Sequence, residues 1–434
     1  MTTCLLGLVS SRLSSELSTV RLRKNHQIED FSTSVTLLRV QSNSLVALKP
    51  RELRDLLLDG ARDAIASFGW DRTSVSKICG AVGLTSGAFY PRFTDRVDAA
   101  TVLWSKRLGP MVTAQVTDLL DQLEKGDQDG FVRAMARFAE GSSDLDVAVE
   151  LLLAAQYDER LAQVVGRDLE QTLRSRFADE NSGIAASRVL CVIVAFGLTM
   201  SRHRTWAKDL DLEPELHRYF EGLSQPGPVL SLPALRAEYL LHPATLSQDP
   251  LLSAFYQNGY RAVSDVGYAK ASLKDICNSA GITTGFLFAR HEGKLDFFLE
   301  VVRQGWKANF DKGLAFAHDV ATNYGEVIAE AVVLREFAQP EYRGQVRVNL
   351  EIQRLARFSG EASTLVNSEE LRLLEQFGQG QQTPDTSYFA TEMAVGNGVF
   401  LLTSFMEGIE TFDFVAPLST LLKLRGLRVS EEHR

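Results

Sequence analysis

The chain has little of what marks several large classes of protein. It contains only 4 cysteines and 12 prolines in 434 residues, and the cysteines form no CxxC pair and no spacing with histidine that suits a metal ion. A disulfide-stabilised scaffold and a zinc module are therefore not expected. Also missing are the HExxH, Walker, GxSxG and dinucleotide-binding glycine motifs. We accordingly expect no catalytic residues, no metal and no cofactor, and predict that the protein is not an enzyme.

Long apolar runs are also scarce. No run approaches the roughly 18 residues that a membrane-spanning helix needs. The first residues lack both a preceding charge and a small-residue cleavage site, so no signal peptide is expected. Apolar residues make up 45% and charged residues 23% of the chain, which is ordinary for a globular protein. These features predict a cytoplasmic protein without a membrane partner.

Positive charge is scarce over the chain as a whole. The formal net charge is −9, which argues at first against nucleic acid as a partner. The distribution of the charge argues the other way. Residues 49–107 carry ten Lys or Arg against seven Asp or Glu, and residues 249–307 carry seven against six. These two slightly basic segments of an acidic protein have the sign of charge that contact with phosphates requires.

The same two segments contain an internal repeat. A constant offset of 198 residues aligns residues 73–93 with residues 271–291 without a gap. Identical residues stand at Ser74/Ser272, Ile78/Ile276, Cys79/Cys277, Gly83/Gly281, Thr85/Thr283, Gly87/Gly285 and Arg92/Arg290. Repetition at a fixed period means two copies of one structural unit.

Each copy has the pattern of a helix followed by a helical hairpin. In the first copy, apolar residues at helical spacing follow Pro50, and Gly69 ends that helix. In the second copy the corresponding helix is Leu251–Tyr260, and Gly259 is expected to end it. That assignment requires an insertion of eight residues within Arg261–Lys270. The hairpin follows in both copies, with Ser or Thr at the start of each helix and Gly at the turn.

Residues 83–99 closely resemble the DNA-binding signature of the TetR family of bacterial transcriptional regulators. That signature has a Gly turn, a polar pair, Gly, a small residue, a large apolar residue, Tyr, Phe, and a Lys or Arg that opens the fourth helix. The first copy matches every one of these positions. Residues 281–297 match most of them, but Phe288 stands where the family has Tyr and His291 where it has Phe.

The resemblance implies an all-α fold of two tandem TetR-like units. Each unit would have a three-helix helix-turn-helix domain followed by a helical ligand-binding and dimerisation domain. The expected boundaries are a poorly ordered arm (1–48), the first helix-turn-helix domain (49–107), the first helical domain (108–224), a linker (225–248), the second helix-turn-helix domain (249–307) and the second helical domain (308–434). The connecting helices are expected at Asp95–Leu108, which breaks at Gly109-Pro110, and at Lys294–Phe310.

A recognition helix places short polar and apolar side chains in the major groove, while basic and hydroxyl side chains hold phosphates. We therefore expect each hairpin to contact DNA. The first copy offers Thr73, Lys77, Thr85, Ser86, Ala88, Tyr90, Arg92 and Arg96, and the second offers Ser272, Lys274, Thr283, Thr284, Phe286, Phe288, Arg290, His291 and Lys294. Phe89, Phe93 and Leu287 are assigned to the core instead.

These observations predict a sequence-specific DNA-binding transcriptional regulator, a ligand-responsive repressor that acts as a single-chain pseudo-dimer. By the resemblance, Ile184–Trp206 and Thr391–Phe412 would pack together as the dimer interface, and fusion makes that packing intramolecular. The expected partners are a double-stranded DNA operator and an apolar or amphipathic small-molecule effector. Because the two readers differ at Ala88/Phe286 and Tyr90/Phe288, the operator is expected to be an imperfect inverted repeat.

Two alternatives remain open. In the first, only the first hairpin binds DNA, the second half senses a ligand or docks a partner, and two chains pair as a homodimer. In the second, the protein is an all-α carrier or enzyme without a DNA role. Aromatic stripes such as Phe196 with Met200 and Phe400 with Phe405 are more often core than pocket walls, so no ligand-binding residue is assigned.

Overall fold

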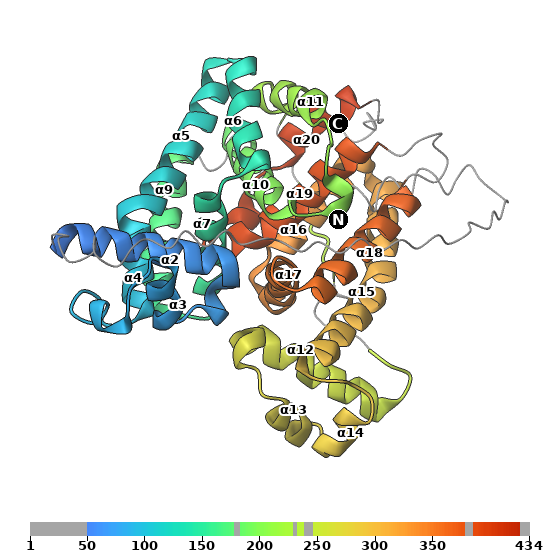
Figure 1. Cartoon of the computed structure of the whole chain (residues 1–434). Coiled ribbons are helices and arrows are strands. Elements are labelled where there is room, and N and C mark those ends of the chain that lie inside the picture. The colour runs from blue at the N-terminus through green and yellow to red at the C-terminus, as the bar shows by residue number, and fades with distance from the viewer. Residues whose placement is uncertain (1–49, 178–182, 229–231, 238–245, 378–384, 426–434) are drawn as a thin grey trace.

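Helices account for all the regular structure in the described part of the chain, as the sequence predicted (Figure 1). The computed structural model describes residues 50–177, 183–228, 232–237, 246–377 and 385–425. The arm predicted at residues 1–48 lies outside them, and so does much of the predicted linker. The described linker residues 232–237 are not helical and lie against α16 (Glu326–Ala338), where Arg335 donates hydrogen bonds to the carbonyls of Pro233 and Leu235.

The first half of the chain builds a helical hairpin and then a helical bundle. Its elements are α2 (Pro50–Arg72), α3 (Val75–Ala81), η2 (Ser86–Ala88), α4 (Arg96–Leu103), η3 (Trp104–Leu108), α5 (Gly109–Lys125), α6 (Gln128–Glu140), α7 (Ser143–Ala155), α8 (Glu159–Leu161), η4 (Ala162–Gly166), α9 (Arg167–Arg176), α10 (Gly183–Ser201), η5 (Thr205–Ala207) and α11 (Glu213–Ser224). We call α2, α3 and η2 the first hairpin domain.

The second half follows the same order. Its elements are α12 (Pro250–Lys270), α13 (Leu273–Ser279), α14 (Thr284–Phe288), α15 (Lys294–Tyr324), α16, η7 (Pro340–Tyr342), α17 (Arg343–Ala356), α18 (Gly360–Phe377), α19 (Thr386–Thr403), η8 (Ile409–Thr411) and α20 (Val415–Leu424). We call α12, α13 and α14 the second hairpin domain. Figure 1 shows both hairpin domains on the lower side of the molecule, below α10 and α19.

The first helix of the second half ends later than the sequence suggested. Gly259 lies inside α12, buried against Phe297, and the residue with positive φ is Gly267 at 79°. Its counterpart in α2 is Gly69, with φ of 72°. Gly69 and Gly267 are 198 residues apart, so the predicted eight-residue insertion does not exist. A left-handed backbone strongly favours glycine, and a buried glycine at a close helix contact looks the same in a sequence.

The connecting helix of the first half does not break at Gly109-Pro110. It continues from α4 through the π-helical turn η3 into α5 and ends at Lys125. The wider turn before Pro110 accommodates the proline, which has no backbone N–H to donate. Gly109 gives the room that the neighbouring helix needs, since a Cβ there would lie 2.6 Å from an oxygen of Asp168. In the second half the connecting helix, α15, runs unbroken to Tyr324.

The two halves meet along α10 and α19, the segments predicted to pair. A Cβ on Gly197 of α10 would lie 1.7 Å from the carbonyl oxygen of Ala394, and one on Gly398 of α19 would lie 1.8 Å from that of Ile193. The helices can therefore cross only where both have glycine. Helices α11 and α20 pack beside this crossing and complete a four-helix arrangement.

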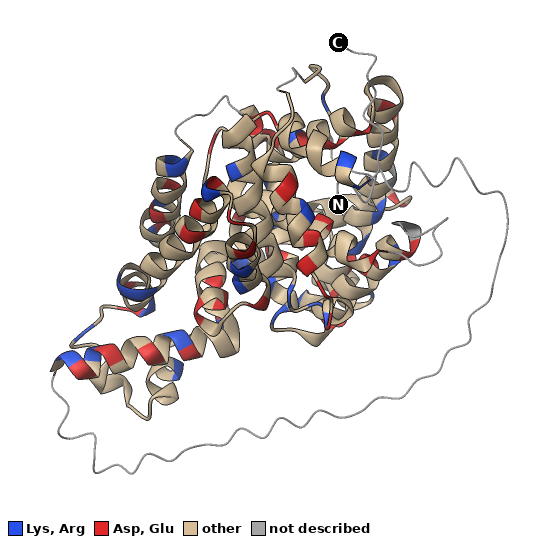
Figure 2. Ribbon diagram, turned by 90° about the horizontal axis from the view of Figure 1, so that it is seen from above, with Lys and Arg blue, Asp and Glu red and all other residues tan. Residues whose placement is uncertain are grey.

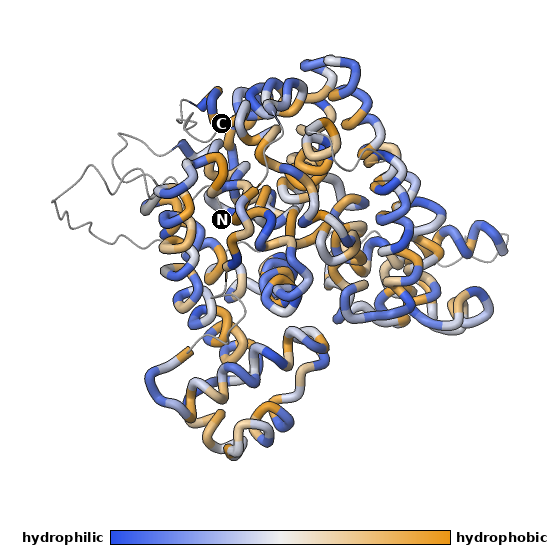
Figure 3. The backbone as a smooth tube through the Cα atoms, turned by 180° about the vertical axis from the view of Figure 1, so that it is seen from behind, coloured by the Kyte–Doolittle hydropathy of each residue, from blue (hydrophilic) through white to orange (hydrophobic). Residues whose placement is uncertain are grey.

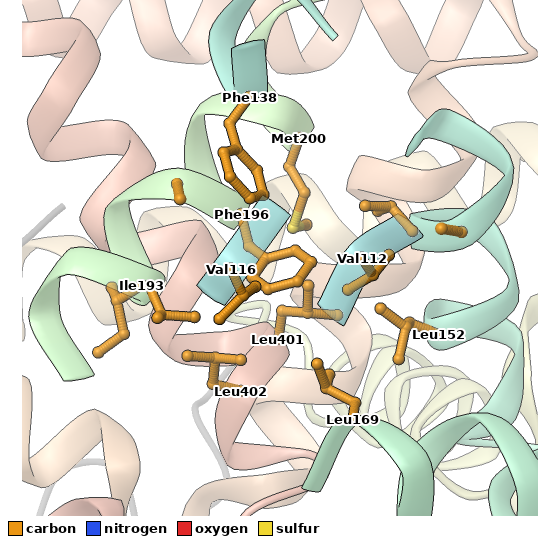
Figure 4. Close-up of a cluster of buried hydrophobic side chains, with 14 of the residues drawn as sticks. Val112, Val116, Phe138, Leu152, Leu169, Ile193, Phe196, Met200, Leu401 and Leu402 are labelled. Carbon is orange, nitrogen blue, oxygen red and sulfur yellow. The ribbon is translucent and has the colours of Figure 1, made fainter. Parts of the chain in front are cut away.

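One hydrophobic core runs through both halves (Figures 3 and 4). Figure 4 shows Leu401 and Leu402 of the second half beside Ile193 and Phe196 of the first half. All four side chains are buried, and so is Met200, which agrees with the core assignment of that aromatic stripe. Burial of this apolar surface stabilises the two halves as one body.

Helix α10 also corrects the statement that no apolar segment is long enough to cross a membrane. Gly183–Ser201 passes that test by length and composition, with a mean hydropathy of 1.9. However, 89% of this apolar stretch is buried inside the protein, as is usual for a helix of a hydrophobic core. Among the described residues no other helix passes the test.

Candidate nucleic-acid interface

The two hairpin domains have the same capped helix and the same glycine turn. In the first, the hydroxyl of Ser74 accepts a hydrogen bond from the amide of Lys77 and caps α3. The chain then turns through Gly83, whose φ is 71°, and the next amide donates to the carbonyl of Cys79 at 2.8 Å. Left-handed glycine after the last helical residue is a common helix terminator.

The second hairpin repeats each of these features. The hydroxyl of Ser272 caps α13 by accepting from the amide of Asp275. Gly281 has a φ of 67°, and the following amide donates to the carbonyl of Cys277 at 3.0 Å. The repeat seen in the sequence is therefore a repeat in local structure. Ser272 acts as a cap here, so the side chain is already engaged in the free protein.

The segment after the turn differs between the copies. In the second it is the short helix α14, capped by the hydroxyl of Thr283, which accepts from the amide of Phe286. In the first it is only the 3₁₀ turn η2, and Thr85 makes no such capping bond. The predicted short recognition helix is therefore present in the second copy and reduced to a single turn in the first.

The outer surface of both segments combines small polar groups with one large aromatic ring. Thr85 and Gly87 are exposed in the first copy, as are Thr283, Thr284 and Gly285 in the second. Ser86, Ala88 and Phe286 are half-buried. The rings of Tyr90 and Phe288, which occupy equivalent positions, are 62% and 60% exposed. The two rings are thus accessible to a partner at equivalent positions of the two copies.

The rings beneath this surface form the cores of the hairpins. Phe89, Phe93 and Leu287 are all buried, which confirms their assignment to the core. Phe286 has a double role: its ring makes a T-shaped contact with Phe255, with 6.0 Å between the ring centroids, and the guanidinium of Arg290 lies over it, 3.7 Å from its centroid.

Basic side chains line the ends of both recognition segments. The guanidinium of Arg92 donates to the carbonyl of Ala88 at 2.8 Å, and that of Arg290 donates to the carbonyl of Phe286 at 3.2 Å. Lys77 donates to the carbonyl of Arg72, while Lys274 is exposed on α13. A guanidinium has five N–H donors, so one bond to a carbonyl leaves donors for a phosphate.

Arg96 and Lys294 stand at equivalent positions and hold the first helix of each copy. The guanidinium of Arg96 donates to the carbonyl of Trp70 at 2.9 Å and lies over its ring. The ammonium of Lys294 donates to the carbonyl of Ala269 at 2.9 Å, and burial lowers its pKa. A cation at a helix C-terminus interacts favourably with the helix dipole. Their first role is thus to fix the hairpin to the connecting helix.

Two of the predicted contact residues are buried. Thr73 is 2% exposed, and its hydroxyl donates to the carbonyl of Gly69 at 2.7 Å. His291 is 6% exposed and packs edge-to-face against aromatic rings that include Phe297, with Nδ1 3.2 Å from a carboxylate oxygen of Asp296. His291 therefore occupies the core position that Phe93 has in the first copy. We remove Thr73 and His291 from the set of DNA contacts.

Sequence reasoning missed the residues that anchor the hairpin domains. The amide of Trp70, just after Gly69, donates to a carboxylate oxygen of Glu150 at 2.7 Å. The amide of Tyr268, just after Gly267, donates to Glu351 at 2.8 Å. The offset of 198 residues pairs Trp70 with Tyr268, and it could have revealed Gly267. Nothing local in the sequence marks the two glutamates.

Charge does not gather on one face of the first hairpin domain. Figure 2 shows basic and acidic positions mixed along α2. Its first turn holds Arg51 and Glu52, and further along Arg62 pairs with Asp63 at 2.8 Å. Arg51 and Arg72, near the two ends of α2, are exposed and remain for phosphates together with the basic groups of the hairpin, which agrees with the small excess of positive charge in the sequence.

Comparison with known proteins gives one family. Residues 57–98, which extend from α2 through the hairpin into α4, match the family described as bacterial regulatory proteins, tetR family. No curated protein matches the chain. Together with the all-helical fold, the match over the first hairpin domain supports a DNA-binding transcriptional regulator of the TetR family.

Proposed function

We propose that the protein is a single-chain pseudo-dimer in which both hairpin domains read one DNA operator. The observation that carries this proposal is the pair of hairpins with matching turns, caps and exposed rings, Tyr90 and Phe288, on a bundle with one shared core. Each half would supply one reader, and α10, α11, α19 and α20 would take the place of a dimer interface. The domain limits that we propose remain 49–107, 108–224, 249–307 and 308–434.

In this proposal the DNA contacts come from the exposed and half-buried residues of the two hairpins. They are Lys77, Thr85, Ser86, Ala88, Tyr90 and Arg92 in the first copy, and Lys274, Thr283, Thr284, Phe286, Phe288 and Arg290 in the second. Arg96, Ser272 and Lys294 support the hairpins from within and reach phosphates only as a second role. Polar side chains near the N-terminus of the segment would read base edges, and the basic groups would position the domain.

The proposal predicts that both exposed rings matter. We expect Tyr90→Ala and Phe288→Ala each to weaken specific binding about tenfold or more, because each removes an aromatic ring whose full burial is worth about 1.5–3 kcal/mol. Binding to DNA from upstream of the gene, at two salt concentrations, would measure the effect. Leu371→Ala is the matched control, since Leu371 is exposed on α18, away from the hairpins.

A second candidate function is favoured by the differences in the second hairpin. Phe288 lacks the hydroxyl of Tyr90, and the recognition segment is a capped helix in the second hairpin but a single turn in the first. If only Tyr90→Ala weakens binding, the second hairpin does not read DNA, and two chains would have to pair on the operator. The molar mass in solution then distinguishes the candidates, since the pseudo-dimer has the mass of one chain, 48.0 kDa.

We further propose that a small-molecule effector binds in the first half. A cleft of about 850 Å³ lies between α5 and the segment from η4 to α9, lined by Trp104, Pro110 and Val164 together with Asp118 and Asp168. The mixed lining suits an amphipathic molecule. A cavity in the second half, between α15 and α17 to α19, has only about 40 Å³. An occupant would push α5 and α9 apart and tilt the connecting helix.

Thermodynamic linkage tests this part of the proposal. If the effector favours an arrangement that binds DNA poorly, effector and operator must weaken each other's binding by the same factor. Isothermal titration of a candidate amphipathic molecule, with and without operator, measures both affinities. An effector affinity that does not change when the operator is bound would refute the regulatory role, although DNA binding itself would stand.

A further inference from the structure

A buried cluster of charges lies between the two hairpin domains. Glu150 of α7 and Glu351 of α17 are each 1% exposed, and each accepts the amide at the end of the first helix of its own half. Arg354 of α17, 5% exposed, joins them: its Nε lies 2.9 Å from Glu150 and its Nη1 lies 3.2 Å from Glu351. Its Nη2 lies 2.9 Å from Asp71 at the end of α2.

One unbroken path of polar contacts therefore connects the hairpin domains. It leads from the amide of Trp70 through Glu150, Arg354 and Glu351 to the amide of Tyr268. Burial acts to lower the pKa of Arg354, but the carboxylates around it raise that pKa above its usual range, so the guanidinium stays charged. Burial raises the pKa of Glu351. Removing several charges from water costs free energy, and such clusters are a weak source of stability.

Aromatic packing crosses between the halves at the same place. Phe358, at the end of α17, lies over Gly69 of the first hairpin domain, where a Cβ would be 2.9 Å from its ring. Tyr157, at the end of α7, lies over Gly267 of the second, where a Cβ would be 3.1 Å away. The ammonium of Lys270 also donates to the carbonyl of Tyr157 at 2.8 Å. Each half thus contacts the positive-φ glycine, Gly69 or Gly267, of the other half.

We infer that Arg354 is a positioning residue that couples the two hairpin domains and fixes the distance between their recognition segments. Glu150 and Glu351 accept equivalent amides in the two halves. Three residues after Glu351 the chain has Arg354, but three residues after Glu150 it has Leu153. One guanidinium therefore serves both halves. Two identical subunits would bring either two arginines or none to this place. The device therefore fits a fused chain. The inference about Arg354 rests on the proposed function only in assuming that both hairpin domains bind DNA.

The decisive test removes the charges and keeps the hydrogen bonds. In the variant Glu150→Gln/Arg354→Met/Glu351→Gln, the glutamine carbonyls can still accept the amides of Trp70 and Tyr268. Replacing buried ion pairs by neutral side chains of similar size is often neutral for stability. Asp71 keeps its charge in this variant, but its side chain is 31% exposed to solvent. Arg354→Lys serves as a second variant, because one ammonium keeps the charge but lacks the fork that spans two carboxylates.

The matched control is a second cluster of the same composition. Arg425, at the end of α20, bridges Glu215 of α11 and Glu392 of α19, and all three side chains are buried. Figure 1 shows α11 and α20 on the upper side of the molecule, far from the hairpin domains. The control variant is Glu215→Gln/Arg425→Met/Glu392→Gln.

The distance between the hairpin domains is measured without DNA. Nitroxide labels are placed at Gly80→Cys and Asn278→Cys, which are equivalent and exposed, in a chain that carries Cys4→Ser. A side chain at Gly80 meets open space, and the described native cysteines are buried. Pulsed electron–electron double resonance measures the distance between the two labels. The parent and the control variant should give one narrow distance distribution. The Arg354 triple variant should give a broad or shifted distribution, and Arg354→Lys an intermediate one.

An unchanged distribution in the folded triple variant overturns the inference, and if that variant does not fold, an unchanged distribution in Arg354→Lys does so. A second readout is how strongly binding depends on the spacing between the operator half-sites. The ratio of affinities for the best spacing and for other spacings should fall about tenfold in the triple variant, which is within the range of coupling energies for residues of one network. If the parent binds no specific DNA, the proposed function fails, but the distance measurement still decides whether Arg354 couples the domains.

Discussion

At the scale of single residues, the contacts explain why similar positions have different roles in the two halves. Tyr90 and Phe288 point outward from equivalent positions, but Phe93 and His291 point inward, where the histidine replaces a purely apolar core residue. A polar ring in the core is acceptable because Asp296 and the hydroxyl of Tyr256 lie within hydrogen-bond reach of its nitrogens. Divergence at this position therefore reflects packing and need not reflect DNA recognition.

A second histidine predicts how stability depends on pH. Burial and nearby arginines, of which Arg357 has the largest effect, lower the pKa of His203 to about 3. Asp146 lies 3.3 Å from its Nε2, which acts in the opposite direction, but that carboxylate already pairs with Arg202 and Arg357. We therefore expect burial and the arginines to dominate and His203 to remain neutral in the folded protein.

The sign of the effect follows from linkage. In the unfolded chain His203 takes up a proton as the pH falls below about 6.5, while the folded protein does not. The free energy of unfolding should thus decrease as the pH is lowered through this range. The decrease should be less than about 1.4 kcal/mol per pH unit, because the ring is partly exposed. His203→Gln should lose less stability than wild type in urea unfolding between about pH 7.5 and pH 5. Parallel profiles would show that His203 does not contribute.

At the scale of elements, the glycines of α10 and α19 control how the halves fit together. Gly197→Ala and Gly398→Ala each place a methyl group within 2 Å of a backbone carbonyl of the other helix, so the helices must move apart. We expect each change to lower the free energy of unfolding by roughly 1–3 kcal/mol, the usual cost of overpacking.

Differential scanning calorimetry of these variants tests that expectation. Because the hydrophobic core is common to both halves, a single transition should move to lower temperature, without splitting into two. Gly80→Ala is the control, since a methyl group at this helical position meets open space and should stabilise by about 0.5–1 kcal/mol. Two separate transitions would show that the halves unfold independently and that the crossing is not an essential interface.

At the scale of the whole molecule, local signals were predicted well and long-range contacts were not. Spacing and residue type predicted the hairpins and the buried Phe89 and Leu287. The pairing of α10 with α19 was implied only by the family resemblance. The sequence misplaced the end of α12, because the composition around Gly259 and Gly267 does not show which of them has a positive φ; only the offset of 198 residues from Gly69 marks Gly267. Arg354 could not be found, since its partner Glu150 is 204 residues away in the sequence. Such contacts follow from the packing of helices.

If both hairpin domains read DNA, as we propose, the differences between them lead to a prediction about the operator. Ala88 and Tyr90 of the first reader correspond to Phe286 and Phe288 of the second, so the two half-sites should meet different side chains. Selection from random DNA should therefore give an imperfect inverted repeat with one chain bound per site. Its half-site centres should be roughly 34–36 Å, one helical turn, apart or a small multiple of that distance.

Making the readers alike tests the origin of this asymmetry. In the variant Thr284→Ser/Phe286→Ala/Phe288→Tyr, the exposed face of the second reader becomes that of the first, and the selected operator should become more symmetric. Thermal unfolding must accompany the selection, because Phe286 also packs against Phe255. A perfect palindrome selected by the wild type, or two chains bound to one site, would contradict the proposal that one chain binds the operator as a pseudo-dimer. An asymmetric site for both proteins would place the asymmetry in the bundle, because the bundle would then hold two like readers in unlike positions.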